Sequence, residues 1–374
     1  MSFVRGLLRP WFITTLMCLV YVGIVILSNK GNPTALVTIG TQFSQHITAD
    51  NGGSEGYDGQ FNYYIARDPN SAAQFLDVPA YRFQRILFPL LGRLLALGQS
   101  DLIPWAFLLI NLVALALGTF LLEELLLQFK VSRWYALTYG LTLGIFASVR
   151  LSLSEPLAYA LVLGGIMLAR DKRWLLAALI FALAALAKET TLIFAAAYVF
   201  YLLTQRDWKN GFLLGIIALL PFVVWQAILY KTLGSLGVGS GGAQATSFEL
   251  IPFLGVIRIW TDTPAEVRGK IMLILAPTLL IFVIFPTIWA LWAVFTEIRR
   301  HKWTAETCLL AINALVMLFV PFSTYREPIG ILRFIVGLQI AVILFAAQNR
   351  RVRALRNSTL WIVTLFYVAT LVTG

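Results

Sequence analysis

Asp58 is the residue whose neighbours best suit it to act as an acid or a base. It lies in the sequence EGYDGQ, residues 55–60, in which Gly56 and Gly59 flank the pair Tyr57-Asp58. Glycines on both sides favour a tight turn that presents a short polar side chain. Asp58 is therefore the candidate catalytic carboxylate. The alternative is an ordinary exposed aspartate in a solvated turn.

The residues around Asp58 supply further hydrogen-bonding side chains. Tyr57 precedes it, and Gln60, Tyr63 and Tyr64 follow within six residues. Tyrosines and amides are among the groups that fix the orientation of a bound small molecule in a concave site. We predict that these four residues bind substrate, as they would in a site for a carbohydrate or a lipid headgroup.

Two other segments place charged residues at the ends of apolar stretches. Glu155 precedes Pro156, which is suited to the first turn of a helix. Lys188 and Glu189 interrupt the otherwise apolar region 173–204. All three charged residues are candidate substrate ligands. The simpler alternatives are a helix cap for Glu155 and a salt-bridged turn for Lys188 and Glu189.

A third segment contains two arginines that suit a phosphate group. Tyr325-Arg326 is followed by Arg333, just inside the next apolar run. The planar guanidinium group binds oxyanions through two parallel N–H groups. The alternative is a pair of arginines that extend from the membrane edge into water. Because all these segments are expected on one face of the protein, we predict that they form one site.

The composition defines the kind of protein that carries this site. Of 374 residues, 59% are hydrophobic and 13% are charged, whereas soluble domains are about 45–50% apolar and about 25% charged. This excludes a disordered chain, a coiled coil and a soluble enzyme, and it indicates an all-α polytopic membrane protein. The net charge of +11 then indicates topology rather than nucleic-acid binding.

Eleven apolar runs predict transmembrane helices, with the N-terminus in the cytoplasm. Several are shorter than the roughly 20 residues that cross a bilayer, which predicts helices that end at internal water-filled surfaces. The runs cover residues 11–27, 102–128, 134–149, 156–169, 173–187, 190–204, 210–230, 270–296, 304–321, 330–347 and 359–373.

The apolar stretch 81–97 is predicted to lie in the interface instead of spanning the membrane. On one helix, Arg82, Arg85 and Arg93 would fall within about 80° of one another, which gives an amphipathic helix with a basic stripe. Counting this stretch as a span would also put the later basic loops outside, against the positive-inside rule.

We expect a single transmembrane domain over 1–374 with two long outer loops. The first covers residues 28–101, carries Asp58 and the interfacial helix 81–97, and has a length that is typical of functional loops. The second, residues 231–268, is rich in glycine and fits either a mobile flap or a linker. It lacks the lysine of a nucleotide-binding loop.

No cofactor is predicted. Two cysteines and two histidines have no metal-ligand or disulfide spacing. A lone aspartate leaves a divalent metal open.

The general layout resembles the GT-C superfamily of integral-membrane glycosyltransferases, in which one helix leads into a long outer loop with an acidic residue and interfacial helices. Two segments, Ser154-Glu155-Pro156 and the hairpin that leads to Lys188-Glu189-Thr190, are similar to elements of mannosyltransferases related to PIG-V. In those enzymes an arginine is more usual at the position of Lys188. The segments that carry the resemblance are Tyr57-Asp58-Gly59-Gln60, Ser154-Glu155-Pro156, and the hairpin 169–174 leading to Lys188-Glu189-Thr190.

The resemblance implies a GT-C-like bundle that transfers a sugar, by one inverting displacement, from a polyprenyl-phosphate donor to a lipid, glycan or protein acceptor. Asp58 would be the general base, and Arg82, Arg85, Lys188, Arg326 or Arg333 would stabilise the leaving phosphate. The expected location is a bacterial plasma membrane, with the site on the outer face and lipids, not nucleic acid, as partners.

Two other functions stay open at this stage. A transporter or lipid flippase would have broken helices and internal repeats, and prolines inside several apolar runs agree with the first feature. A third interpretation is a non-catalytic scaffold, or a membrane enzyme of another class such as a lipid phosphotransferase, which a lone aspartate in a long loop does not exclude.

Overall fold

The structure, a computed structural model, describes residues 9–371. Within this range every regular element is a helix, apart from one isolated antiparallel bridge between Ile39 and Gly56. The predicted all-α class is therefore confirmed.

Four helices of the described chain are long and apolar enough to cross a membrane. They are Pro10–Ser28, Ser100–Gln128, Trp208–Leu233 and Ile271–Arg299. A fifth span is possible if Pro328–Phe334 and Val336–Gln348, which meet at an angle of 41°, are counted as one. These helices indicate a membrane-embedded protein.

The predicted count of eleven spans is not confirmed. Trp174–Ala187, Glu189–Thr204 and Ala305–Leu318 are apolar but have only 14 to 16 residues, so at 1.5 Å per residue they are shorter than a hydrocarbon core of about 30 Å. The predicted span 134–149 is wrong, because this stretch divides into three short helices. The stretch 359–371 is a 3₁₀ helix, and residues 372 and 373 of that prediction lie outside the described residues.

The predicted single helix 81–97 is also wrong. The segment contains two short helices, α5 (Pro79–Phe83) and α6 (Leu87–Leu95), separated by a turn at 84–86. Trp225 of α13 donates its indole N–H to the carbonyl of Phe83 at 2.8 Å, which satisfies a backbone group where the helix breaks. Arg93 donates to the carbonyls of Ala66 and Arg67, so it lies apart from Arg82 and Arg85.

The first long loop is built from short helices that pack on α6 and α7. At their centre Phe88 of α6 stacks on Phe107 of α7 with ring centroids 4.5 Å apart. In chain order, the helices from the start to this point are α2 (Pro10–Ser28), η1 (Pro33–Leu36), α3 (Thr41–Ser44), η2 (Ala49–Asn51), α4 (Gly59–Arg67), η3 (Ala72–Phe75), α5, α6, η4 (Ser100–Leu102) and α7 (Ile103–Gln128).

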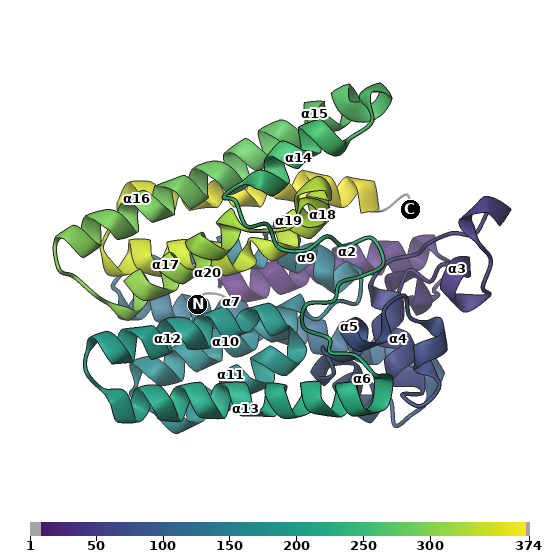
Figure 1. The fold of residues 1–374 in the computed structure, drawn as a ribbon, viewed down its shortest axis with the longest axis horizontal. Coiled ribbons are helices and arrows are strands. Elements are labelled where there is room, and N and C mark those ends of the chain that lie inside the picture. Colours follow the sequence, from purple (N-terminus) through teal and green to yellow (C-terminus); the bar gives the residue numbers. More distant parts are fainter. Residues whose placement is uncertain (1–8, 372–374) are drawn as a thin grey trace, which may run out of the picture.

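Figure 1 shows the rest of the chain in two parts, with α10–α13 below and the helices that follow α14 above. Between α7 and the lower part come η5 (Arg133–Ala136), α8 (Leu137–Gly140) and α9 (Leu143–Arg150). The lower part is α10 (Glu155–Arg170), α11 (Trp174–Ala187), η6 (Glu189–Thr191), α12 (Leu192–Thr204) and α13 (Trp208–Leu233). The upper part is α14 (Leu254–Asp262), α15 (Ala265–Leu279), the π-helical turn η7 (Leu280–Ile284), α16 (Phe285–Arg299), α17 (Ala305–Leu318), α18 (Phe322–Arg326), α19 (Pro328–Phe334), α20 (Val336–Gln348), α21 (Val352–Ser358) and η8 (Thr359–Leu371).

The upper part meets the preceding helices where α17 packs on α12 and where α19 and η8 pack on α9. Residues 234–253, which we call the strap, join α13 to α14. The strap crosses from the end of α13 to the start of α14 beside the first-loop helices (Figure 1). The turns between α10 and α11, between α12 and α13, and between α16 and α17 lie at the opposite ends of those helices. Basic residues lie in or beside each of these turns, among them Arg170, Arg206 and Arg300.

Candidate functional site

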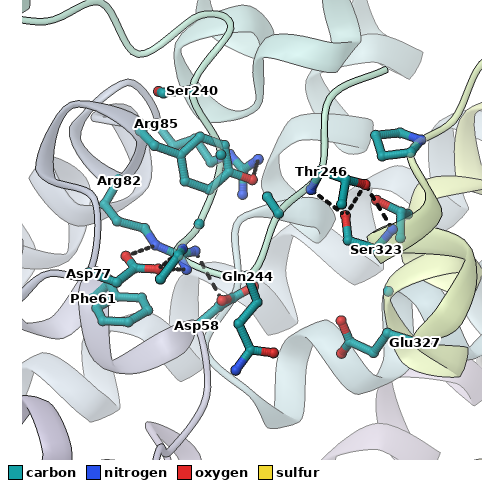
Figure 2. A pocket seen from close by; sticks show the side chains of 18 of the residues that line it. Asp58, Phe61, Asp77, Arg82, Arg85, Ser240, Gln244, Thr246, Ser323 and Glu327 are labelled. Carbon is teal, nitrogen blue, oxygen red and sulfur yellow. Dashed lines mark hydrogen bonds and ion pairs between the residues drawn. The ribbon is translucent and has the colours of Figure 1, made fainter. Parts of the chain in front are cut away.

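A cavity of about 970 Å³ lies where the strap crosses the ends of the helices. Its wall is formed by the first loop, the turn between α11 and α12, the strap, and the segment 321–334. Four segments that are far apart in the sequence therefore converge here, as the sequence predicted for Asp58, Lys188 and Arg333. Figure 2 shows side chains of the first loop, the strap and the segment 321–334 around this cavity.

Asp58 is held in the cavity wall by the fold of its own turn. Gly56 has a φ of +74°, a conformation that favours glycine. A side chain at Gly59 would collide with the carbonyl oxygen of Leu151, and Asn62 donates to the carbonyl of Ser152 at 3.0 Å. The first loop therefore lies directly against the segment that leads into α10, which brings Asp58 close to Glu155.

Arg82 binds two carboxylates at once. Its Nε and Nη2 atoms donate to both oxygens of Asp77, at 2.7 and 2.8 Å, and its Nη1 atom donates to Asp58 at 2.9 Å. Figure 2 shows Arg82 between these two carboxylates. The guanidinium carbon also lies 4.2 Å from the ring centroid of Phe61, a favourable cation–π distance. Arg82 is thus fixed from three sides.

A buried ionic cluster lies behind Asp58. Glu155 Oε1 accepts from Lys188 Nζ at 2.6 Å and from Arg333 Nε at 2.8 Å. Arg333 Nη1 reaches Asp58 Oδ2 at 3.3 Å. A small cavity of about 20 Å³ touches Asp58, Glu155 and Arg333, a volume that suits about one water molecule.

Arg85 forms a separate pair on the cavity wall. It donates to both carboxylate oxygens of Glu189, at 2.8 and 2.7 Å, and to the hydroxyl of Tyr81 at 2.9 Å. This bidentate geometry is the strongest that an arginine and a carboxylate adopt. Lys188 and Glu189, although adjacent in sequence, therefore pair with different partners.

Tyr57 connects the cluster to a carboxylate on the far wall. Its hydroxyl donates to Glu327 Oε1 at 2.6 Å and accepts from Arg333 Nη1 at 3.1 Å. Arg326 is exposed, lines the cavity, and stacks on Phe322 at 5.2 Å. Within residues 9–371 it has no carboxylate within ion-pair distance.

The strap is hydrogen-bonded at both ends and in its middle. Gln226 of α13 accepts from the amides of Gly237 and Val238, at 2.8 and 3.2 Å. Asp77 accepts from the amide of Ala243 at 3.1 Å. At the other end, the amides of Thr246 and Ser323 each donate to the hydroxyl of the other residue, at 3.0 and 3.1 Å, as Figure 2 shows.

The cations around Asp58 control its ionisation. Burial disfavours the charged form and would raise its pKa, but Arg82, Arg333 and Arg85 outweigh burial and lower the pKa of Asp58 to about 2. For Lys188, burial and the nearby arginines lower the pKa, and Glu155 only partly opposes them. Asp58 is therefore a carboxylate at neutral pH.

Several residues predicted to bind substrate have packing positions instead. Tyr63 and Tyr64 are buried among the first-loop helices, where Tyr64 stacks on Phe75. Tyr325 is fully buried, and its hydroxyl donates to the carbonyl of Met317. None of these three lines the cavity in the described structure.

Gln60 lies at the cavity, but its side chain supports the first loop. It accepts from the amide of Gly40 at 3.0 Å and donates to the carbonyl of Glu55 at 2.8 Å. The other predicted residues, Tyr57, Arg82, Arg85, Glu155, Lys188, Glu189, Arg326 and Arg333, line the large or the small cavity.

Sequence reasoning missed Asp77, Tyr81 and Glu327. Asp77 lies two residues before the proline that begins α5 and five residues before its partner Arg82, and this carboxylate–arginine spacing was a usable signal. Glu327 follows Arg326 directly. Tyr81 had no local signal that separated it from an interfacial tyrosine.

Four carboxylates of the site, those of Asp58, Asp77, Glu155 and Glu189, bind arginine or lysine side chains of the protein itself. Between residues 9 and 371, no group of three or more histidine, cysteine, aspartate or glutamate side chains is arranged to hold a metal ion. The site can instead bind an anion through its arginines and accept a proton through its carboxylates.

Comparison with protein-family models, with curated proteins and with solved structures gives no match.

Proposed function

We propose that this protein is a membrane glycosyltransferase with a GT-C-like fold, which moves a sugar from a polyprenyl-phosphate donor to an acceptor hydroxyl. The observation that carries the proposal is the position of Asp58. It is a carboxylate that faces a large cavity, with two arginines in contact with it. One side of such a site suits a leaving phosphate, and the carboxylate suits the attacking hydroxyl.

In the proposed reaction the acceptor oxygen attacks the anomeric carbon as the bond from that carbon to the phosphate oxygen breaks. The phosphate leaves with the bonding electrons, and Asp58 accepts the proton of the acceptor hydroxyl. Arg82 and Arg333 stabilise the departing negative charge. The phosphate is already ionised, so a separate general acid is not required.

The size and placement of the cavity agree with this chemistry. Its volume of about 970 Å³ lies near the upper end of the roughly 300–1,000 Å³ of small-molecule sites, enough for a donor headgroup and part of an acceptor. It lies at the ends of apolar helices, where the phosphate of a lipid would sit while its chain stays in the bilayer.

We propose that the cavity faces the outer side of the membrane. The turns with Arg170, Arg206 and Arg300 lie at the opposite ends of the helices, and basic loops are typically cytoplasmic. A transporter is less well supported, because the charged residues of the cavity lie at helix ends rather than at mid-depth.

The test is a transfer assay on the full-length protein in nanodiscs. Polyprenyl-phosphate sugars are supplied one at a time with acceptors from a membrane extract, and products are identified by mass spectrometry. We expect an acceptor that has gained one hexose or pentose, together with free polyprenyl phosphate. Movement of a lipid across sealed vesicles without any covalent product would contradict the proposal and favour a transporter.

A further inference from the structure

Arg82 and Arg333 are each held by one carboxylate that is not Asp58. Arg82 is fixed by Nε and Nη2 on Asp77, and Arg333 by Nε and Nη2 on Glu155, at 2.8 and 2.7 Å. In both arginines only Nη1 reaches Asp58. Asp58 therefore makes a single contact with each of two arginines that other carboxylates already hold.

Asp58 is also the partner that can leave most easily. Its side chain is 32% exposed, whereas those of Asp77 and Glu155 are 6% and 1% exposed. Moving Asp77 or Glu155 would leave a buried charge without its partner, which is costly. Moving Asp58 into the cavity would expose it to water and leave both arginines anchored.

We propose that Asp58 and a phosphate ester compete for the same two guanidinium groups, so that a phosphate bound to Nη1 of Arg82 and Nη1 of Arg333 displaces the Asp58 carboxylate. The inference rests on the proposed function and adds the location of its anion site. The ligand class is a phosphate ester, such as the headgroup of a polyprenyl-phosphate donor.

Displacement links donor binding to the basicity of Asp58. In contact with the arginines, Asp58 is a weak base, because these cations stabilise its ionised form. Once the guanidinium groups of Arg82 and Arg333 bind the phosphate, the Asp58 carboxylate loses their stabilisation and lies beside a negatively charged group. Both changes strengthen Asp58 as a proton acceptor, and they occur only when the donor is present.

The test measures binding, which does not depend on turnover. The full-length protein in nanodiscs is titrated with farnesyl phosphate and, in a separate arm, with inorganic phosphate. Asp58→Asn removes the competing charge, so we expect it to bind farnesyl phosphate on the order of tenfold more tightly than the wild type. Arg82→Gln should bind it at least about tenfold more weakly.

Glu55→Gln is the matched control for the general loss of one negative charge. Glu55 lines the same cavity but contacts neither arginine, and its Oε1 accepts from Gln244 at 3.3 Å. We expect the affinity of Glu55→Gln for farnesyl phosphate to differ from that of the wild type by less than about twofold. Equal gains in affinity for farnesyl phosphate in Asp58→Asn and Glu55→Gln would overturn direct competition. Unchanged or weaker binding of farnesyl phosphate by Asp58→Asn would overturn it too.

The wild type gives a second readout that does not need a variant to fold. If the phosphate displaces Asp58, deuterium uptake of the backbone around residues 56–60 should rise when farnesyl phosphate is added, whereas a ligand that simply covers the turn would lower it. A fall in uptake would overturn the proposal. Tighter binding of farnesyl phosphate than of inorganic phosphate assigns the site to a lipid, and equal binding assigns it to a free oxyanion.

The two proposals fail in different ways. If Asp58→Asn binds phosphate more tightly but the wild type transfers no sugar, the anion site stands and the glycosyltransferase proposal is wrong. If the wild type transfers sugar but Asp58→Asn gains no affinity, the competition is wrong and the proposed function stands.

Discussion

Lys188 Nζ lies 2.6 Å from Glu155 Oε1, and their side chains are only 6% and 1% exposed. Breaking one side of such a buried pair typically costs about 3–5 kcal/mol of stability, because it leaves a charge without its partner. Glu155 would keep Arg333, so we expect Lys188→Met to lie near the lower end, at about 3 kcal/mol. Thermal unfolding in detergent measures this loss.

The double variant Lys188→Met/Glu155→Gln separates the pair from the rest of the cluster. It removes both charges, so we expect it to be more stable than the sum of the two single changes predicts, with a coupling of about 0.5–3 kcal/mol. Lys231→Met, at an exposed position of α13, is the control for the loss of one lysine charge outside the cluster. Strictly additive effects would contradict an energetic link between Lys188 and Glu155.

Asp58→Asn should abolish sugar transfer without unfolding the protein. The amide keeps the size of the side chain but cannot accept the proton of the acceptor hydroxyl, and losing a general base typically costs about 10²–10⁴-fold in rate. Initial rates of transfer measure the effect. Asp50→Asn, an exposed residue of the same loop outside the cavity, should keep the wild-type rate. Retained activity in Asp58→Asn would remove Asp58 as the base.

Part of this site could be predicted because its charged residues lie at the ends of apolar helices. Glu155, Lys188 and Arg333 interrupt apolar runs, so any fold that buries those runs brings the charged residues to the helix ends, and the structure places them around one ionic cluster. The same logic failed for Tyr63 and Tyr64. Their ring type fits a substrate site, but α4 packs them against neighbouring helices.

The break between α5 and α6 could not be predicted from local sequence. Helical periodicity placed Arg82, Arg85 and Arg93 on one stripe, whereas the indole of Trp225, more than a hundred residues away, bonds the carbonyl at the end of α5. The strap's contact with Asp77 was equally hidden, although the spacing of Asp77 and Arg82 was a usable signal. The amide of Ala243 in the strap also binds this carboxylate.

Tyr57→Phe should weaken the contact between the first loop and α19. It removes the hydroxyl that joins Glu327 to Arg333 but keeps the ring, whose centroid lies 5.7 Å from the Arg333 guanidinium. Because Glu327 is exposed to solvent, we expect a loss of about 1 kcal/mol in stability. Thermal unfolding measures it, and Tyr230→Phe, at an exposed tyrosine, is the control. Equal stability of Tyr57→Phe and Tyr230→Phe would contradict the prediction.

Gln226→Leu should loosen the strap while the helix bundle stays intact. The side-chain oxygen Oε1 of Gln226 accepts from two strap amides, and leucine cannot replace either bond. We expect faster hydrogen exchange at residues 237–247 and a higher donor KM, because the strap covers the cavity. Gln205→Leu, at the opposite end of the helices, should leave strap exchange unchanged. If Gln226→Leu also leaves it unchanged, this side chain does not hold the strap.

Asp58 should stabilise the fold through its arginines at neutral pH and lose this contribution in acid. Its pKa is lowered from 3.8 to about 2, because Arg82, Arg333 and Arg85 outweigh the effects of burial and of Glu155. A carboxylate with a lowered pKa stabilises the fold above its unfolded pKa and loses that contribution as pH falls through its folded value. The stability difference between wild type and Asp58→Asn should therefore shrink as the pH is lowered from 4 to 2. Asp77, whose pKa is also lowered, is present in both proteins, so its titration should largely cancel in the comparison. Unfolding at pH 5, 3 and 2 measures the difference, and a constant difference would show that the arginines do not stabilise the Asp58 carboxylate.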